Sequence, residues 1–476
     1  MRTVFPSLFV FFLLVFVFSC KKDAILTDPS AKLSFSLDTV LFDTVFTTIG
    51  SSTRRLKVYN PNNKKVIVSS IRIAGGPNSK YRMNVDGMPG AFLNDIEIPA
   101  KDSLFIFIEV TIDPLNSNSP LIVTDSIMFV TNGNEQDVDL VAWGQDAHYF
   151  YPDNYVEGLP PYSIICNTNS NTTWVNDKPY VIYGYAVVDS SCGLTIQAGA
   201  RIHFHNNSGL WIYKGGSIKV LGTLAEPVTF QGDRLEPYYR EIPGQWDRIW
   251  INESSVDNEF NYAIIKNGFI GIQAETLESY MGNQLTLNNT IIRNMEGIGL
   301  LTRFYKIAAA NMLIANCGQY ATALTLGGDY DFRHCTFANY WSLKSRKTPS
   351  LLISNYYEDE NGVNQVFSLT KADFKNCIIY GNNENEVLAD NGGGTFNYDF
   401  SYSLLKTNQS LNGTSIFTNI DPGFVDASNR DFKLKSSSFA IDMGDPAALN
   451  KPELMQDLNG NNRGTPPDLG AYEYVP

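Results

Sequence analysis

The sequence predicts an all-β protein in which an antiparallel sandwich precedes a solenoid of short stacked strands. Alternating apolar runs separated by Asn, Gly and Pro turns fill residues 32–148 and are typical of a sandwich. Further on, the motifs YAIIKN, NNTIIRN, NMLIAN, HCTFAN, NCIIYGN and YSLLKT recur every 22 to 27 residues, except for one gap of 42 that spans a polar insertion. A unit this short must stack on its neighbours to bury its apolar face. A second ordinary sandwich with chance similarity between strands is the alternative for this region.

The N-terminus has the features of a secretion signal. One arginine precedes an apolar run from Leu8 to Phe18, which is shorter than the roughly 20 residues of a membrane-spanning helix. The sequence VFSC that ends at Cys20 resembles a bacterial lipobox, which implies removal of residues 1–19 and lipidation of Cys20; a eukaryotic-type signal peptide is the alternative. Residues 20–31 would be a tether. Because no later segment is long and apolar enough to span a bilayer, we expect a lipid anchor alone.

Charge and cysteine content exclude several classes of site. The formal net charge is −13, which argues against nucleic acid or an anionic membrane surface as partner. Aromatic residues reach 13%, as in many carbohydrate-binding proteins and also in ordinary extracellular β-proteins. Five cysteines follow Cys20 without regular spacing, which does not predict a disulfide framework, and no CxxC pair suggests zinc. Cys335 and Cys377 share one slot of the repeat, so we expect them in a core.

Residues 32–148 contain the segments LKVYNPNNKKVIVSSIRI, IPAKDSLFIFIEV and DSIMFVTNGNEQDVDLVAWG. Their order resembles an immunoglobulin-like module of the abnormal-spindle-like and choice-of-anchor type. The resemblance implies a binding or spacer role and no catalytic residues.

Residues 161–420 begin with GLTIQAGARIHFHNNSGLWIYKGGSIKVLGTLAEPVTFQG. This resembles the first coils of right-handed parallel β-helix proteins of the pectate-lyase-like superfamily. Asparagine tolerates the left-handed conformation of their corners, so we expect Asn294, Asn316 and Asn339 at matching corners. The resemblance implies that their amides form a ladder. We expect apolar side chains near the core at Ile291, Leu313 and Phe337.

Residues 421–476 closely resemble the C-terminal segment of many secreted bacterial β-helix proteins, with a D-x-G-A-x-E motif and Phe439 where proline is usual. We interpret the segment as a cap over the last coil, which identifies architecture and no chemistry. Together with the lipobox it suggests a lipoprotein of the Bacteroidetes type.

The cap contains the stretch DLNGNNR, and calcium loops likewise place oxygen-bearing side chains at the first, third and fifth positions, here Asp457, Asn459 and Asn461. The glycine and glutamate of an EF-hand are not in place. We therefore expect turns here, with Arg463 paired to Asp468 or Glu473, no metal and no cofactor; Ca²⁺ is the alternative.

Two further pairs of side chains are candidate sites. His203 and His205 alternate on one strand beside Arg201 and would be half a metal site, but Arg201 repels a cation, so we expect a solvated outer face. Lys266 and Arg293 share one repeat slot, roughly 5 Å apart on adjacent coils. They are the candidates for a lyase base and its charge-neutralising partner, and a solvated pair is the alternative.

Insertions in a solenoid are where ligand loops lie. The stretches DRLEPYYREIPGQWDRIW and NYWSLKSRKTPSLLISNYYEDENG interrupt the repeats, and their aromatic side chains are the candidate ligand-binding residues: Tyr238, Tyr239, Trp246, Trp341 and Tyr356. Alternatively, Trp246 begins a coil.

The sequence therefore predicts a lipid-anchored protein, periplasmic or on the outer-membrane surface, that binds polysaccharide or cell-surface glycan. The N-x-D, D-D, G-H-G and R-x-K motifs of pectin-cutting β-helix hydrolases are absent, and no acid–base constellation is evident. A lyase acting on uronate-containing glycan and an adhesin for a protein partner are the alternatives.

Overall fold

A computed structural model describes residues 24–114, 121–166, 170–276 and 284–476. The chain divides into two compact units, Met1–Asp146 and Ala147–Pro476. Cys20 and the signal segment lie outside the described residues. Within the described part, no helix is both long and apolar enough to cross a membrane.

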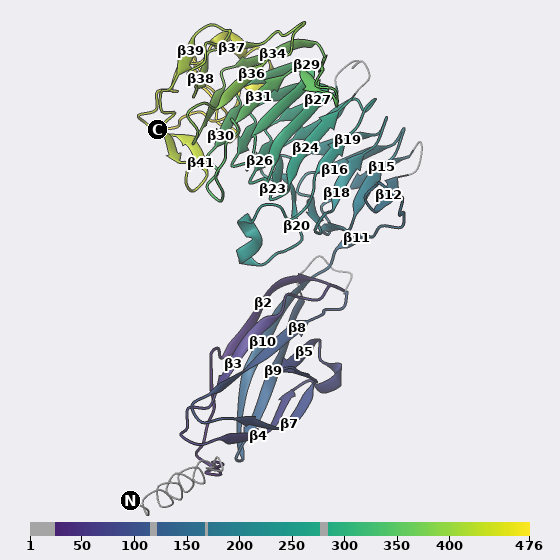
Figure 1. Cartoon of the computed structure of the whole chain (residues 1–476), viewed down its shortest axis with the longest axis vertical. Coiled ribbons are helices and arrows are strands. Elements are labelled where there is room, and N and C mark those ends of the chain that lie inside the picture. Colours follow the sequence, from purple (N-terminus) through teal and green to yellow (C-terminus); the bar gives the residue numbers. More distant parts are fainter. Residues whose placement is uncertain (1–23, 115–120, 167–169, 277–283) are drawn as a thin grey trace, which may run out of the picture. The chain divides into compact units, whose positions relative to one another are not determined.

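The first unit is an antiparallel sandwich, as predicted (Figure 1). Its neighbouring strands run antiparallel, apart from the parallel pair β2 and β10. One sheet contains β1 (Ser34–Phe35), β3 (Arg54–Tyr59), β8 (Ser103–Val110), β5 (Tyr81–Val85) and β6 (Met88–Pro89). The other contains β2 (Thr39–Phe46), β10 (Asn134–Gln145), β9 (Leu121–Thr131), β4 (Val66–Ile73) and β7 (Phe92–Ile98). In β8, buried Leu104, Ile106 and Ile108 alternate with outward residues, which is how a period of two fills the core between sheets.

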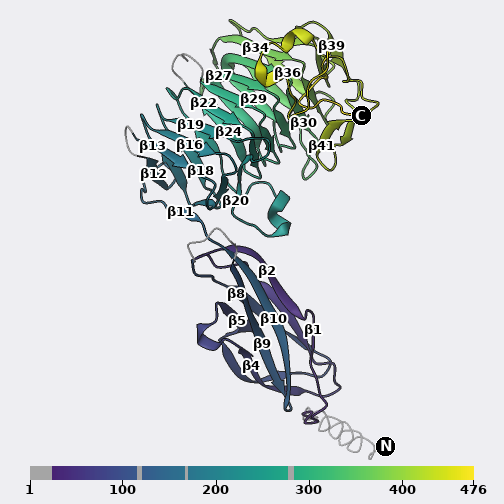
Figure 2. The ribbon, with the colours of Figure 1, turned by 180° about the vertical axis from the view of Figure 1, so that it is seen from behind.

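The second unit is a parallel β-helix with three faces, which confirms the predicted fold class (Figures 1 and 2). Its lateral sheet consists, in order, of β11 (His148–Phe150), β14 (Tyr180–Ile182), β17 (Arg201–Phe204), β20 (Val228–Gly232), β23 (Ala263–Lys266), β26 (Ile291–Arg293), β28 (Leu313–Ala315), β30 (Thr336–Asn339), β35 (Ile378–Gly381), β38 (Ser403–Leu405) and β39 (Ile416–Thr418). Because β11 already pairs with β14, the β-helix begins before residue 161, where the sequence analysis placed its start.

The other two faces belong to one branched sheet. The front sheet contains β12 (Tyr162–Cys166), β15 (Tyr185–Val188), β18 (Gly209–Ile212), β21 (Ile249–Ile251), β24 (Ile270–Glu275), the first parts of β27 (Ile298–Ala310) and β29 (Thr322–Arg333), β31 (Leu351–Ser354) and β36 (Val387–Asp390). The back sheet contains β13 (Asn171–Trp174), β16 (Gly193–Gln197), β19 (Ser217–Leu221), β22 (Asn258–Asn261), β25 (Leu285–Asn288), the second parts of β27 and β29, β34 (Leu369–Lys375) and β37 (Asp399–Ser401). A small hairpin of β32 (Tyr356–Glu358) and β33 (Asn364–Val366) projects from the second insertion, and η3 (Pro237–Glu241) lies in the first.

Left-handed residues turn the chain into the lateral sheet. The corner residues of six coils all have φ between 46° and 56°: Tyr262, Asn289, Asn311, His334, Asn376 and Tyr402. At this corner the carboxamide of Asn311 donates to Asn289 (3.1 Å) and that of Asn289 donates to Asn261 (3.2 Å), so an amide ladder connects three coils.

The predicted ladder of Asn294, Asn316 and Asn339 is wrong. These residues follow register-matched positions, and Asn294 and Asn316 are left-handed, but Asn339 ends strand β30. Asn294 bonds to Asn267 (2.7 Å), whereas Asn316 and Asn339 accept from backbone N–H groups. At the predicted end the amide–amide contact joins Asn267 and Asn294, whereas the ladder that spans three coils lies at the opposite end of the lateral strands.

The interior is a continuous apolar column. Phe332, Phe374 and Phe400 stack on successive back-sheet strands with centroids 4.9 Å apart. Phe337 belongs to this core as predicted, but Ile291 and Leu313 occupy the neighbouring slot, which faces outward.

That outward face is covered by residues 421–476, here called the C-terminal strap (Figure 2). The strap contains β40 (Phe424–Asp426), β41 (Asp431–Leu434), η4 (Pro446–Ala448) and η5 (Pro452–Leu454). Its apolar side chains pack against Leu313, Ala338, Ile378 and Leu404 of four lateral strands. The expectation of a cap over the last coil is therefore corrected: the segment runs along the side of several coils, because their lateral faces are apolar too.

Cys166 and Cys192 form a disulfide, which corrects the expectation drawn from the odd cysteine number. They lie at the ends of adjacent turns of the first coils, so the fold brings together two cysteines whose spacing carried no signal. Cys335 and Cys377 are free and buried, as predicted.

Candidate functional site

The outer face of the front sheet carries rows of side chains that stand in register from coil to coil. One row runs through Trp211, Trp250, Gln273, Leu301 and Ala323. Successive strands of a parallel sheet lie about 4.8 Å apart, so such a row forms a strip across the coils. The row is aromatic at its beginning, polar in the middle and apolar at its end.

The two tryptophans form the aromatic part. The rings of Trp211 and Trp250 stack with centroids 4.8 Å apart and an interplanar angle of 12°. Tyr185 and Tyr213 meet the Trp211 ring edge-on. These contacts fix the ring planes before any ligand is present.

Glu275 at the end of β24 organises the polar part. It accepts hydrogen bonds from Trp250 Nε1 at 2.6 Å, Gln273 Nε2 at 2.9 Å, Arg303 Nη1 at 3.1 Å and Asn252 Nδ2 at 3.4 Å. Four donors satisfy both carboxylate oxygens, so Glu275 holds its neighbours in place.

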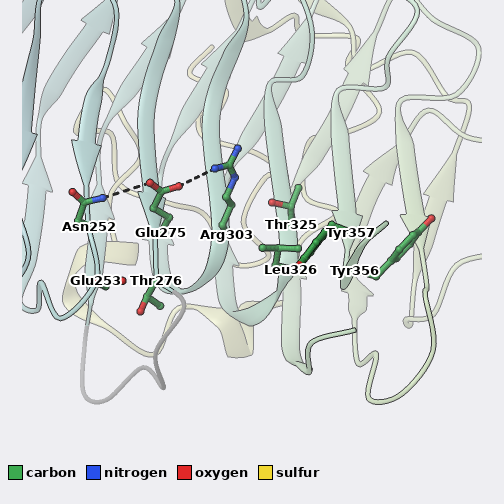
Figure 3. A pocket seen from close by; sticks show the side chains of 9 residues that line it. All are labelled: Asn252, Glu253, Glu275, Thr276, Arg303, Thr325, Leu326, Tyr356 and Tyr357. Carbon is green, nitrogen blue, oxygen red and sulfur yellow. Dashed lines mark hydrogen bonds and ion pairs between the residues drawn. The ribbon is translucent and has the colours of Figure 1, made fainter. Parts of the chain in front are cut away.

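An open pocket of about 590 Å³ lies at this edge of the front sheet (Figure 3). It is lined by Asn252, Glu253, Glu275, Thr276, Arg303, Thr325, Leu326, Tyr356 and Tyr357. We call it the front pocket. Glu275, Arg303 and Thr325 are register neighbours, and Figure 3 shows Asn252, Glu275 and Arg303 joined in one chain of polar contacts, with the two tyrosines at the other end.

The two tyrosines come from the hairpin of the second insertion. Tyr356 packs over Gly392 and donates from its hydroxyl to Asp390 Oδ2 at 2.9 Å. Tyr357 is 48% exposed. One ring is therefore fixed and the other is open to a ligand.

The front pocket is acidic. Among its described lining residues Arg303 is the one cation, and it is paired with Glu275; the second lining carboxylate, Glu253, pairs with Lys214 at 3.3 Å. The Asp390 carboxylate lies behind Tyr356. This charge balance disfavours a polyanion.

The structure separates the aromatic residues that the sequence analysis grouped. Tyr356 lies in the front pocket. Trp246 is 1% exposed, stacks on Phe204 in the core and donates to Lys266 O at 2.9 Å, so its prediction as a ligand residue is wrong and the alternative, the start of a coil, holds. Trp341 is 5% exposed and reaches only the wall of another pocket.

Tyr238 and Tyr239 lie in η3, away from the front pocket's lining. The Tyr238 ring is 75% exposed, while the guanidinium of Arg234 stands over the Tyr239 ring at 3.9 Å. Tyr239 is thus engaged within its own insertion.

Lys266 and Arg293 are register neighbours, as predicted. They are not a solvated pair: Glu241 from the first insertion folds over them, 2.9 Å from Arg293 Nη2 and 3.9 Å from Lys266 Nζ. Burial and the Arg293 charge lower the pKa of Lys266. Its ammonium group faces the Glu241 carboxylate and the Arg240 carbonyl, so no access for a substrate proton is evident.

His203 and His205 do not share a solvated face, which corrects the sequence expectation. His203 is buried and donates from Nδ1 to Gly232 O at 3.0 Å, and burial lowers its pKa to about 4. His205 bonds to Asp233 at 2.8 Å and stacks on Tyr183.

Asp457 anchors the strap. Its carboxylate accepts from the backbone N–H groups of Asn459, Asn461 and Glu473 and from the Asn461 amide, at 2.7 to 3.1 Å. Both Asp457 carboxylate oxygens are thus used by N–H donors, and the described residues contain no group of three or more His, Cys, Asp or Glu side chains that could hold a metal ion. Arg463 pairs with Glu473 at 3.2 Å, as predicted.

The back sheet carries the register-matched carboxylates Asp331, Asp373 and Asp399. Burial raises the pKa of Asp373, whereas Arg333 and Lys371 outweigh burial and lower that of Asp331. Because Lys371 bridges Asp331 and Asp373 at 3.4 and 3.5 Å, the two acids form part of an ion-pair ladder.

Trp211, Glu275 and Arg303 are not among the site residues predicted from the sequence. One signal was available: the triplets LWI and IWI, ending at Ile212 and Ile251, repeat a tryptophan between two inward residues. Nothing comparable marks Glu275 or Arg303, since only the coil register brings them together.

No family model matches the chain, and no curated protein matches it. Among solved structures, an ASH / PapD-like domain of human CEP192 is 10% identical over 27% of this chain and 94% of that chain, with a TM-score of 0.18. The catalytic unit of a thermostable GH87 alpha-1,3-glucanase from Streptomyces thermodiastaticus is 9% identical over 76% of each chain, with a TM-score of 0.29. A GH87 alpha-1,3-glucanase catalytic domain in complex with nigerose is 11% identical over 86% of this chain and 99% of that chain, with a TM-score of 0.17.

At these identities and TM-scores the likenesses carry no information on what this chain binds. In fold, the chain combines a two-sheet, mostly antiparallel β-sandwich with a parallel β-helix.

Proposed function

We propose that this protein binds a neutral carbohydrate chain at the front pocket. The observation that supports this proposal best is that a group of hydrogen-bonded polar side chains around Glu275 and two tyrosine rings border one open pocket. Sugars present apolar C–H faces between hydroxyl groups, so they fit rings that lie beside amide, guanidinium and carboxylate groups.

The charge of the pocket selects among ligands. A uronate-containing glycan would bring carboxylates toward Glu253 and Glu275, and the cations Lys214 and Arg303 are already paired with these two carboxylates. A neutral glycan carries no such cost. This favours a neutral ligand over the uronate substrate of a lyase.

The hydrogen bonding of Glu275 favours binding over turnover. A general acid must carry a proton and a general base must reach its target. Glu275 accepts four hydrogen bonds from protein groups, so both of its carboxylate oxygens are already engaged within the protein. We therefore assign it a positioning role, with Tyr357, Asn252 and Arg303 as contact residues.

The test is a titration of the full chain with neutral oligosaccharides and with oligouronides of equal length, followed by calorimetry. Tyr357→Ala should weaken binding of a neutral oligosaccharide at least tenfold. Tyr238→Ala is the matched control, because that ring is also exposed but lies outside the pocket lining. Equal loss in both variants, or binding that survives Tyr357→Ala unchanged, would overturn the assignment. Release of new reducing ends or of unsaturated products would show that the protein cleaves the glycan, and the binding assignment would then be replaced by a catalytic one.

We further propose that the mature protein is a bacterial lipoprotein, of the Bacteroidetes type, anchored through Cys20 in the periplasm or on the outer-membrane surface. The lipobox-like VFSC sequence after an apolar run supports the anchor. A surface or periplasmic position would bring the front pocket to glycans outside the cytoplasm.

A further inference from the structure

A second pocket, of about 410 Å³, lies between the lateral sheet, the second insertion and the strap. We call it the strap pocket. Its lining includes Asn294, Asn316, Tyr340, Trp341, Asn382 and Arg430. Trp341 and Leu343 give it an apolar wall, and the asparagines and Arg430 give it a polar one.

Three cations from separate segments converge beside this pocket. Lys266 comes from β23, Arg293 from β26 and Arg430 from the turn between β40 and β41. Their nitrogens lie 3.9, 2.9 and 3.3 Å from the carboxylate of Glu241. Their side chains are 13%, 22% and 33% exposed, so solvent screens them only in part.

One carboxylate does not balance three cations. Burial works to raise the pKa of Glu241, but the hydrogen bond and charge of Arg293, with Arg430 and Lys266, outweigh it and lower that pKa. The group of four retains a charge of about +2 on a chain whose formal net charge is −13. Local positive charge at this level, partly desolvated, attracts an anion even against the field of the whole protein.

Arg430 connects the cations with the strap pocket, since it both pairs with Glu241 and lines the pocket. A guanidinium has five N–H donors in a planar fork, and one carboxylate uses two at most in a bidentate pair. Arg430 therefore retains donors for a second anionic group, while Tyr340 and Trp341 offer ring surface beside it.

We propose that the strap pocket binds an anionic group, a carboxylate or sulfate, with Arg430 as its main contact and Glu241 as an internal carboxylate that competes for the same cations. This site is separate from the front pocket and does not rest on its assignment. It takes the anionic ligands that the acidic front pocket disfavours.

The experiment measures binding of sodium glucuronate, sodium sulfate and glucose to the full chain, by calorimetry and by the fluorescence of the tryptophans. Glucuronate should bind and glucose should not, with an affinity that falls as NaCl is raised. Glucuronate binding tighter than sulfate identifies an acidic sugar as the ligand source. Equal binding of both identifies the free anion, and no binding of either overturns the proposal.

Variants locate the binding. Arg430→Asn should weaken glucuronate binding at least tenfold; asparagine suits this position because Arg430 has φ +66°. Glu241→Gln should strengthen binding several-fold, since it removes the competing charge and keeps a side chain of similar shape. Lys433→Gln on β41 is the control, because that lysine pairs with Asp431 and does not line the pocket. Weaker binding in a Glu241→Gln variant with unchanged melting temperature, or unchanged binding in Arg430→Asn, would overturn the proposal.

Discussion

The indole of Trp250 donates a hydrogen bond of 2.6 Å to Glu275, which stands one coil further along the front sheet. The bond fixes the ring beside the front pocket and ties two coils together through side chains. It is the contact on which the geometry of the proposed glycan site depends most.

Glu275→Gln should therefore weaken binding of a neutral oligosaccharide about tenfold, or about 1.4 kcal/mol, and shift the emission of Trp250. The new NH₂ group would face donors where the carboxylate accepted, which leaves at least one of them unpaired. Glu259→Gln is the matched control, because Glu259 makes only a partly exposed 3.7 Å pair with Lys219 on the back sheet. Loss of binding in both variants would contradict the assigned role.

Arg463→Met should destabilise the β-helix by about 3 to 5 kcal/mol, because it leaves the buried Glu473 without its partner. Arg463 also donates to Asn311 at 2.9 Å, so the strap should detach from the ladder corner and become sensitive to proteolysis. Urea unfolding and limited proteolysis measure the two effects. Lys451→Met, which removes an exposed pair with Glu453, should change stability by less than about 1 kcal/mol.

Acidification should destabilise the second unit between about pH 6.5 and pH 4. His203 has a folded pKa of about 4, below its ordinary value of 6.5, since burial, Arg201 and Lys266 outweigh the Gly232 carbonyl and Asp233. It therefore contributes stability that is complete above pH 6.5 and is lost as the unfolded chain takes up a proton, by up to about 3 kcal/mol. Thermal unfolding across this range should show the loss.

His203→Gln should reduce that pH dependence, because glutamine stays neutral at every pH. Buried His334, whose pKa is also lowered by burial, should leave part of the effect in place. His148→Gln, at a partly exposed position, is the control. An unchanged slope in the His203 variant would refute the assignment.

Reduction of the Cys166–Cys192 disulfide should lower stability by about 3 to 4 kcal/mol, given a sequence separation of 26 residues. The same loss is expected for a double Cys→Ser variant, with no further effect of reductant. Since Cys317, Cys335 and Cys377 are buried, free-thiol labelling of the native chain should be low before and after reduction except at the two released cysteines.

Cys20→Ser should release the protein from the membrane fraction, if the lipid is its anchor. Cell fractionation followed by immunoblotting measures the release. Retention of the variant in the membrane fraction would show another attachment.

The fold could be predicted because its signals are local. Asparagine and glycine at left-handed corners, strands of a few β-branched residues and a repeat near 22 to 27 residues each depend on the backbone preferences of neighbouring residues. The strap motif was also recognisable from sequence, and its Asp457, Arg463 and Glu473 act together within a short segment.

The site could not be predicted, because exposure depends on what packs over a residue from far along the chain. Trp246 and Trp250 lie four residues apart, yet one is in the core and the other faces the front pocket's polar row. For Lys266 and Arg293, the sequence allowed a solvated pair, whereas in the structure the Glu241 carboxylate lies against both cations.

The class of fold, the repeat and the turn residues could be predicted from the sequence alone, since those follow from short-range conformational preference. Tertiary structure decided the registers of coils of unequal length, and with them the disulfide, the ladder corner and the convergence of Asn252, Glu275 and Arg303 on one pocket. Neighbouring residues on adjacent strands of the parallel sheet are one whole coil apart in sequence. Every insertion in a coil therefore changes which residues become neighbours across the sheet.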